Sequence, residues 1–259
     1  MNKPLVTIVL LTWNREKHLR RCLASLYAAL SPDIDREIFL WDNASTDGTR
    51  EILKQYENRP DTTVIYSEKN LRLAAYKKLF DRAKGRVIIE VDDDVLDFPR
   101  NFDRTLVDYI DAYPDFGFIA LDVIQDEKTD GAKPLGLQYH DVCRGDKTIE
   151  EGAAGGWCSA FRRRHYLMLR PFMWFYSFKF NKPEDYVLTG LLRRVLHKRY
   201  GIVKGVKCFH ACGPAYAQDF NTLEREFEKY STGGCLDLAK QYEQIIRKEK
   251  TCLPKCSSD

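Results

Sequence analysis

The N-terminal half of the chain alternates short apolar segments with longer stretches in which apolar residues recur every three or four positions. Short apolar runs are typical of buried strands, and the wider spacing is typical of helices that pack on a sheet. Their alternation is the pattern of βαβ units, in which each helix carries the chain back to the same edge of a parallel sheet. We therefore predict an α/β fold with a mostly parallel central sheet and helices on both faces.

The pattern predicts the individual elements along the chain. In the first half the predicted strands cover 6–11, 37–41, 63–66 and 86–91, and the predicted helices cover 16–30, 47–56 and 71–83. After Pro99 we predict a helix at 102–113, a strand at 116–121, an exposed loop at 125–136, mixed strands at 137–143 and 156–161, a helix at 184–199 and a strand at 202–209. Two charged helical stretches follow Asp219, with Gly233 and Gly234 as the break between them.

The charge balance and the apolar segments exclude several classes of protein. The net charge of +3 is a small difference between 41 basic and 38 acidic residues, so a dedicated nucleic-acid binder is not expected. No apolar run is long enough for a transmembrane segment, and the N-terminus lacks the sections of a secretory signal. We therefore expect a cytoplasmic location, with peripheral contact at the inner face of the membrane as an open alternative.

Polar residues follow three of the predicted strands where each strand ends. They occupy 12–14, 42–49 and 92–94. In open α/β sheets, ligands bind beyond the carboxyl ends of the strands, so these segments are the candidates for a binding site. The sequence therefore predicts a ligand site along this edge.

Three consecutive aspartates, Asp92, Asp93 and Asp94, directly follow the apolar strand at 86–91. Their carboxylates repel one another, and crowding them is costly unless a cation shares them. Mg²⁺ is typically held by one or two carboxylates together with the phosphates of a substrate. The triplet therefore predicts half of a metal-diphosphate site, with a solvated acidic loop as the alternative.

The ordered motifs at 7–15, 41–49 and 92–94, together with Asn70 and Pro99, resemble those of family 2 glycosyltransferases. The resemblance covers the N-terminal half nearly without a break. It implies the GT-A fold, a Rossmann-like nucleotide-diphospho-sugar transferase fold, and a nucleotide-sugar donor with Mn²⁺ or Mg²⁺. It also implies a GT-A domain at 1–215, with a nucleotide-binding half at 1–98 and an acceptor-binding half at 99–215. A helical C-terminal extension at 216–259 follows.

The same resemblance implies roles for individual residues. Thr12 and Asp42 would contact the base and ribose of the nucleotide. Asp93 would face the ribose and the metal. The implied donor site comprises Thr12, Asn14, Arg15, Asp42, Asn70, Lys77, Asp92, Asp93, Trp157 and Glu184, and the implied metal ligands are Asp94, Asp92 and His210. His210 follows an apolar strand, and a purely structural histidine is the alternative.

One segment departs from the family pattern. After Asn70 the family usually has glycines and then an arginine, whereas this chain continues Leu71-Arg72-Leu73-Ala74-Ala75-Tyr76-Lys77. Lys77 stands where the arginine normally approaches the diphosphate, but a lysine is a point charge without the bidentate geometry of arginine. The alternative for Lys77 is a solvated helix face.

The catalytic base is expected from the second half. Glu184 and Asp185 follow Pro183 at the start of a predicted helix, which resembles the acidic pair that lines the family's acceptor site. We predict Asp185 as the general base that takes the proton of the acceptor hydroxyl during a single, inverting displacement. Ordinary helix capping is the alternative, because proline at the first helical position and acids in the first turn are favourable by themselves.

Three further features leave alternatives open. Trp157, in a glycine-containing segment, is expected either to stack on a sugar or to be an ordinary buried tryptophan. The aromatic run at 172–178, with arginines nearby, is interpreted as core packing, an acceptor lid or a membrane-surface contact. The cysteines are expected to be reduced thiols, and the alternative is a zinc site formed by Cys208, Cys212, Cys252 and Cys256.

Taken together, these patterns predict an inverting glycosyltransferase that uses a nucleotide-diphosphate sugar, with UDP favoured, and that glycosylates a glycan, lipid-linked or protein acceptor in polysaccharide or glycoconjugate synthesis. A sugar nucleotidyltransferase is the alternative enzyme. A non-catalytic nucleotide-sugar-binding protein is the alternative from another class. The released product, pyrophosphate or nucleoside diphosphate, separates the two enzymes.

Overall fold

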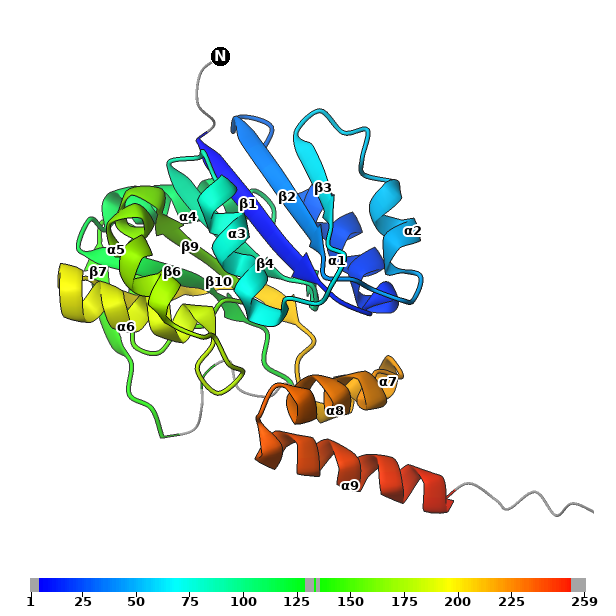
Figure 1. Cartoon of the computed structure of the whole chain (residues 1–259). Helices are drawn as coiled ribbons and strands as arrows, with labels where there is room; N and C mark the ends of the chain where they lie inside the picture. The colour runs from blue at the N-terminus through cyan, green and yellow to red at the C-terminus, as the bar shows by residue number, and fades with distance from the viewer. Residues whose placement is uncertain (1–4, 129–132, 134–135, 253–259) are drawn as a thin grey trace, which may run out of the picture.

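The apolar segments of the N-terminal half form four parallel strands, as predicted, in the order β3-β2-β1-β4. The computed structural model describes residues 5–128, 133 and 136–252 (Figure 1). These strands are β1 (Val6–Thr12), β2 (Arg36–Asp42), β3 (Thr62–Tyr66) and β4 (Val87–Asp92). Because they are parallel, their carboxyl ends lie at one edge of the sheet.

The second half of the sheet is mixed, so the expected parallel pairing holds for the first four strands and for β6 with β10, and the other pairs are antiparallel. The order continues β4-β9-β6-β10-β8-β7, and β5 pairs with β10. The strands are β5 (Val95–Asp97), β6 (Phe116–Val123), β7 (His140–Arg144), β8 (Lys147–Glu151), β9 (Cys158–Arg162) and β10 (Arg199–His210). β9 is antiparallel to both neighbours. Between β6 and β9 the described residues contain no helix that would return the chain to the same edge.

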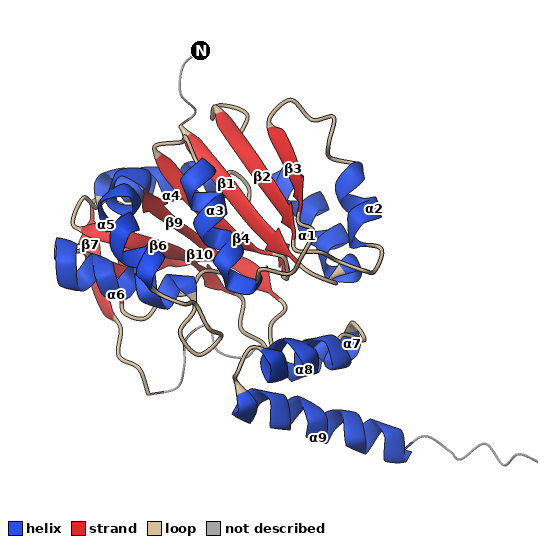
Figure 2. Cartoon of the chain, viewed as in Figure 1, coloured by secondary structure: helices blue, strands red, loops and turns tan. Residues whose placement is uncertain are grey.

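Helices cover both faces of the sheet (Figure 2). One group is α1 (Glu16–Ala29), α2 (Thr49–Lys54) and α4 (Phe102–Ala112), and the other is α3 (Ala75–Arg82), α5 (Arg163–Phe175) and α6 (Glu184–Leu196). A short 3₁₀ turn, η1 (Arg72–Ala74), precedes α3. No helix was predicted at α5, because an arginine cluster and the internal Pro171 obscure its helical pattern.

The C-terminal helices lie beyond the edge at which β1 and β4 end (Figure 1). They are α7 (Pro214–Asp219), α8 (Leu223–Thr232) and α9 (Leu236–Cys252). The last two correspond to the two predicted helical stretches, whereas α7 was not predicted. The division of the chain into domains at residue 215 stays a prediction. None of the helices in the described ranges is long and apolar enough to cross a bilayer.

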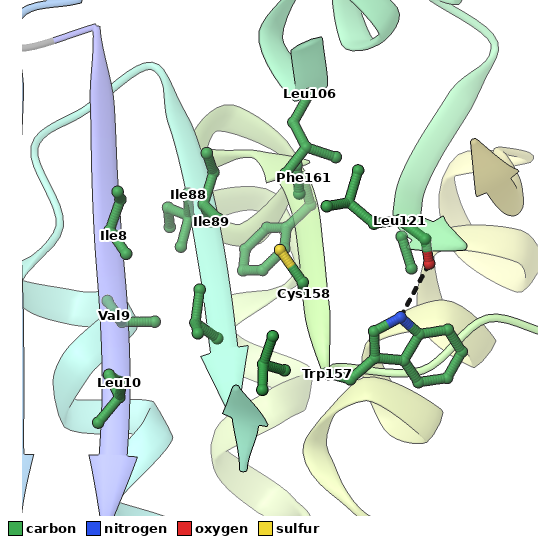
Figure 3. Packing of buried hydrophobic residues seen from close by; sticks show 14 of the residues in the cluster. Ile8, Val9, Leu10, Ile88, Ile89, Leu106, Leu121, Trp157, Cys158 and Phe161 are labelled. Atoms are coloured by element: carbon green, nitrogen blue, oxygen red, sulfur yellow. Dashed lines mark hydrogen bonds between the residues drawn. The ribbon is translucent and has the colours of Figure 1, made fainter. Parts of the chain in front are cut away.

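The core lies between the sheet and the two helical layers, and its members are aliphatic and aromatic side chains (Figure 3). Ile8 on β1, Ile89 on β4 and Phe161 on β9 are fully buried. Trp157, just before β9, is also buried, and its indole N–H donates to the Leu121 carbonyl at 2.8 Å. This core fixes β4 and β9 side by side and therefore positions the segments that follow β4 and precede β9.

Candidate active site

The strand ends bring the first predicted residues together. Thr12 lies opposite Asp42, and Leu11 lies opposite Asp92, in the register of β1 with its two neighbours. The Thr12 hydroxyl donates to Oδ2 of Asp93 at 2.8 Å, and both residues are buried. The aspartate triplet is thus held against the end of β1, and it is not a solvated acidic loop.

A cavity of about 500 Å³ opens at this edge. Its walls are the ends of β1 and β4, the turn η1, the start of α6 and the helix α8. The predicted residues that line it are Thr12, Arg15, Asn70, Asp92, Asp93, Asp94, Glu184 and Asp185. The structure therefore places eight of the predicted site residues around one space, although they come from distant parts of the chain.

Asp94 is the centre of a buried charge network. Its Oδ2 accepts a bond from Nη1 of Arg15 at 2.6 Å, and Nη2 of the same guanidinium binds Glu226 of α8 at 2.6 Å. All three side chains are buried. Burial opposes ionisation of Asp94, but the Arg15 guanidinium and His210 hold its pKa well below the ordinary value. Asp94 is therefore a carboxylate at neutral pH.

His210 reaches Asp94 because β10 pairs with β5. His210 lies opposite Val95 in that antiparallel pair, and the Ala211 N–H donates to the Asp94 carbonyl at 2.8 Å. Nε2 of His210 is 3.0 Å from Oδ1 of Asp94 and 3.9 Å from Oδ2 of Asp92. The three residues predicted as metal ligands are thus neighbours.

Cys212 joins this group as a residue that sequence reasoning did not assign to it. Single donor atoms of Asp94, His210 and Cys212 lie within 4.8 Å of one another. A carboxylate oxygen, an imidazole nitrogen and a thiol sulfur are all donor types that divalent cations accept. The carboxylate suits Mn²⁺ and Mg²⁺, and the thiol suits softer metals.

Asp92 and Asp93 have higher pKa values than an ordinary aspartate. Burial and the neighbouring Asp94 carboxylate raise the pKa of Asp92 to about 6. Burial also raises the pKa of Asp93, although the Arg15 guanidinium opposes the change. The Tyr76 hydroxyl, which lies in the cavity wall, donates to Oδ1 of Asp92 at 3.4 Å. Crowded and desolvated carboxylates of this kind are stabilised when a cation binds between them.

Asp185 faces the cavity from the first turn of α6. Its Oδ2 accepts the backbone N–H of Gly156 at 2.8 Å, a bond to a different element that capping does not require. Oδ1 accepts the N–H of the next residue, Tyr186, at 2.5 Å. Burial raises the pKa of Asp185 against these hydrogen bonds. The carboxylate is therefore oriented by the backbone and has gained basicity, as a general base requires.

Glu184 lines the cavity beside Asp185 and is itself buried. Glu90, a fully buried residue of β4, lies near enough for the two negative charges to repel each other, and neither oxygen of Glu90 has a hydrogen-bond partner among the described residues. Burial raises the pKa of both groups. Gly156 lies against Glu90, and a Cβ at this position would come within 3.3 Å of the Glu90 carboxyl carbon. The glycine before β9 therefore allows the chain to pass close to both acids.

Five predicted residues do not line the cavity. Asp42 is fully buried, and its carboxylate accepts the Ser45 N–H at 3.0 Å and Nε of Arg50 at 2.7 Å. Asn14, which has a positive φ of 48°, binds the N–H of Thr46 at 2.7 Å and so links the loops after β1 and β2. Both side chains shape the edge of the sheet.

Lys77, Trp157 and His210 also lie away from the cavity surface. Nζ of Lys77 donates to the Tyr176 carbonyl at 2.6 Å and lies 4.7 Å from the Phe178 ring centroid. Trp157 is packed in the core, with its ring centroid 6.1 Å from that of His210. His210 touches the site through Asp94 from behind the cavity wall.

Three basic side chains that the sequence analysis did not assign to the site also line the cavity. Arg225 and Lys229 line it from α8, and Arg72 lines it from η1. The Arg225 guanidinium donates to the Trp13 carbonyl at 2.8 Å and lies 5.3 Å from the Trp13 ring centroid. Nζ of Lys229 is 3.6 Å from Glu226. The sequence signal for Arg225 and Lys229 is the run of alternating charges in a helix that no motif connects to the site.

Six cysteines are free thiols among the described side chains, and these are Cys22, Cys143, Cys158, Cys208, Cys212 and Cys235. Cys208 donates to the Asp122 carbonyl at 3.5 Å, whereas Cys212 lies with Asp94 and His210. The side chains of Cys252 and Cys256 lie outside the described residues, so the predicted four-cysteine zinc site stays untested.

Comparison with known sequences gives a family match. Residues 7–167 match the family described as "Glycosyl transferase family 2". TuaG of Bacillus subtilis, named as a teichuronic acid biosynthesis glycosyltransferase, is 35% identical over 94 residues, which are 36% of this chain and 36% of TuaG. Abequosyltransferase RfbV of Salmonella typhimurium is 33% identical over 69 residues, 27% of this chain and 21% of RfbV. The matches thus span about a third or less of the length of these relatives.

Solved structures share the fold at low sequence identity. The mannosyltransferase PcManGT of Pyrobaculum calidifontis, in complex with GDP-Man and Mn²⁺, has a TM-score of 0.61 at 18% identity. The aligned region covers 88% of this chain and 62% of the PcManGT chain. S. aureus TarS 1–349, in complex with UDP-GlcNAc, has a TM-score of 0.61 at 16% identity, and the aligned region covers 86% of this chain and 66% of the TarS chain. These neighbours are GT-A glycosyltransferases, so the predicted GT-A fold is confirmed.

Proposed function

The chain belongs to glycosyl transferase family 2, and from this premise we propose that it transfers a sugar from a nucleoside diphosphate to an acceptor hydroxyl with inversion at the anomeric carbon. The observation that carries the proposal is the shared cavity. The aspartates after β4 and the base candidate Asp185 line the same space. A single displacement needs this arrangement, because the acceptor must be deprotonated on one side while the diphosphate departs on the other.

The acceptor side is formed by the start of α6. Asp185 takes the proton from the acceptor hydroxyl as its oxygen attacks the anomeric carbon, and the bond from that carbon to the diphosphate oxygen breaks. The Gly156 N–H holds Oδ2 of Asp185 and so fixes the direction of the carboxylate. Burial raises the pKa of Asp185, which makes its carboxylate a stronger proton acceptor.

The donor side is formed by the strand ends and α8. The Asp94, Asp92 and His210 side chains, with Cys212 beside them, would hold Mn²⁺ or Mg²⁺. When bound, the cation supplies a Lewis acid that neutralises charge on the departing diphosphate. Arg225, Lys229 and Arg72 add positive charge to the same cavity. Mn²⁺ accompanies the donor in the PcManGT complex, which supports a divalent cation here.

We favour a UDP-sugar as the donor and a glycan, lipid-linked or protein acceptor, in polysaccharide or glycoconjugate synthesis. TarS binds UDP-GlcNAc and PcManGT binds GDP-Man, so both bases occur among proteins that share this fold. A cytoplasmic location remains a prediction from the sequence.

A product assay tests the proposal. The protein is incubated with UDP- and GDP-sugars and Mn²⁺, and released UDP or GDP is measured together with the anomeric configuration of the product. We expect release of nucleoside diphosphate that depends on the cation, and an inverted product. Pyrophosphate release would instead identify a nucleotidyltransferase. Donor binding without release of either product, with a broad set of acceptors, would identify a nucleotide-sugar-binding protein.

A further inference from the structure

Helix α5 presents an apolar stripe to solvent. Its inner face packs on the sheet through Tyr166, Leu169 and Met173, which are fully buried. The outer face carries large apolar side chains at helical spacing, and these are Leu167, Met168, Phe172, Trp174 and Phe175, followed by Tyr176. Phe175 is 91% exposed and Met168 is 59% exposed. Contiguous exposed apolar side chains of this size mark a binding surface, because their exposure to water is unfavourable.

A basic groove adjoins this stripe. The groove is lined by Leu5, Lys84, Gly85, Arg86, Asp111, Arg162, Arg163, Arg164 and Leu167. Leu167 belongs to both features, so the groove and the stripe are continuous. Asp111 is the acid in the groove wall, and Arg86 already binds it at 2.6 and 2.8 Å. The groove therefore has an excess of positive charge.

The positive charge of α5 distinguishes between two possible partners for the apolar stripe, a second copy of the chain and an anionic bilayer. The helix contains three arginines and no acidic residue, and the exposed Lys179 and Lys182 follow it. A second copy of the same stripe would bring like charges together, which opposes self-association. An anionic bilayer matches both properties, because its interface accepts aromatic side chains and its headgroups attract lysine and arginine.

The stripe is joined to the acceptor side of the cavity. Lys77 of α3 holds the end of α5 through the Tyr176 carbonyl and the face of Phe178. The chain then continues to Phe180 and Pro183, which line the cavity beside Asp185. α5 and α6 pack against each other on the same face of the sheet (Figure 1). A molecule anchored in a membrane under α5 therefore lies on the acceptor side of the site.

We propose that the α5 stripe and the basic groove dock the protein on an anionic lipid bilayer, and that the acceptor is a lipid-linked molecule presented at that surface. The acceptor part of this inference rests on the proposed function, whereas the docking part does not. Docking places the aromatic side chains in the interfacial region and lipid phosphates in the groove. The lipid portion of the acceptor stays in the bilayer, and its hydroxyl-bearing head reaches Asp185.

Vesicle sedimentation of the full chain tests the docking. Vesicles of phosphatidylcholine alone are compared with vesicles that also contain phosphatidylglycerol. We expect binding to the anionic vesicles, and a partition coefficient reduced about 10-fold or more in the double variant Phe172→Ser/Phe175→Ser, because two interfacial anchors are lost. Arg164→Glu/Lys84→Glu should cause a similar loss, since each basic residue near the surface contributes roughly 5-fold.

Matched controls and contrary outcomes complete the test. Leu236→Ser removes an exposed apolar side chain from α9, and Lys240→Glu reverses an exposed charge there, so both should leave binding unchanged. Equal binding to neutral and anionic vesicles would overturn the proposal. So would wild-type binding by the double serine variant, or a dimer in analytical ultracentrifugation that this variant dissociates.

Donor hydrolysis separates this proposal from the proposed function. Release of nucleoside diphosphate in the absence of acceptor and vesicles should be unchanged in Phe172→Ser/Phe175→Ser, because neither side chain lines the cavity. Transfer to a lipid-linked acceptor embedded in anionic vesicles should fall about 10-fold in the same variant, along with the partition coefficient. Vesicle binding without any sugar chemistry would refute the proposed function alone. Sugar transfer to soluble acceptors without vesicle binding would refute the docking alone.

Discussion

The edge of the sheet and helix α8 line the same cavity from opposite sides, and they contribute opposite charges. The edge contributes Asp92, Asp93 and Asp94, which are adjacent in sequence and follow an apolar strand. α8 contributes Arg225 and Lys229, from a helix far along the chain. The acids proposed to hold a cation and the basic side chains proposed to face a diphosphate therefore come from separate parts of the fold. Arg15, which binds Asp94 and Glu226 together, connects them.

Breaking the buried ion pair between Arg15 and Glu226, which links the sheet edge to α8, should cause the largest change, a loss of unfolding free energy. Glu226→Gln removes the charge that neutralises one side of the buried Arg15 guanidinium, and breaking a buried pair in this way costs about 3–5 kcal/mol of unfolding free energy. Urea denaturation measures the loss. Glu243→Gln is the control, because its ion pair with Arg247 is largely exposed and should contribute less than about 1 kcal/mol. Equal losses in the two variants would show that α8 does not depend on Arg15.

Removal of the base should abolish most transfer without loosening either region. Asp185→Asn preserves the shape of the side chain but cannot accept the acceptor proton, so kcat should fall about 10²-fold or more. Calorimetry should find donor affinity unchanged, because Asp185 lies on the acceptor side. Asp219→Asn, a change at the half-exposed last residue of α7, should keep wild-type kcat. Transfer by Asp185→Asn at the wild-type rate would refute the assignment of the base.

The junction between the two regions should weaken in acid. His18 of α1 lies under Phe220 of the C-terminal region, with ring centroids 4.1 Å apart, and burial followed by the Arg15 charge lowers its pKa to about 3. An unfolded histidine titrates near about pH 6.5, so below this pH the unfolded chain binds a proton that the folded chain does not. The contribution of neutral His18 to the free energy of unfolding is therefore fully present above about pH 6.5 and is lost as the pH falls towards 3.

The size of this effect is measurable. At pH 5 the loss should reach about 2 kcal/mol of unfolding free energy relative to pH 7. Urea denaturation at both pH values, with His18→Gln beside the wild type, isolates the contribution, because the variant lacks the titrating ring. His197→Gln, at the exposed end of α6, is the control. A pH dependence shared by His18→Gln and the wild type would contradict the expectation.

Removal of one basic side chain of α8 should cause the smallest change, a modest loss of affinity for nucleoside diphosphate. Lys229→Met keeps the length of the side chain and removes its charge, so the Kd for nucleoside diphosphate should rise about 5- to 10-fold, as expected for loss of one ion pair with phosphate. Isothermal titration calorimetry at low and high salt measures this change, which should shrink as salt screens the interaction. Lys240→Met, on α9, should leave Kd unchanged. An unchanged Kd in Lys229→Met would limit the donor site to the sheet edge.

The sequence predicted the sheet edge because local patterns define it. The strands β1, β2, β3 and β4 are apolar runs, and a parallel sheet aligns the polar residues that follow them. The neighbourhood of Asp94 and His210 was expected only through the family resemblance, and the structure explains it by the pairing of β10 with β5. GT-A architecture and family membership were thus predictable from ordered motifs.

The remaining features depend on contacts between distant residues. Arg15 and Glu226 are separated by most of the chain, and no local spacing predicts that a charged surface-like helix will close the cavity. Lys77 was placed near the diphosphate by analogy with an arginine, yet the aromatic segment after α5 captures its ammonium. Arg72 occupies the cavity wall because η1 turns its backbone to a positive φ of 51°. Sequence patterns give element types, but side-chain partners follow from packing.

The antiparallel pairing of β10 with β5 also orders events during synthesis. Asp94 leaves the ribosome long before His210, and the two meet only when the long final strand is laid against the short one. A nascent or truncated polypeptide that ends before this strand therefore has the acids but lacks their imidazole neighbour. Any cation site that needs both side chains is therefore complete only after the last strand of the sheet has been placed.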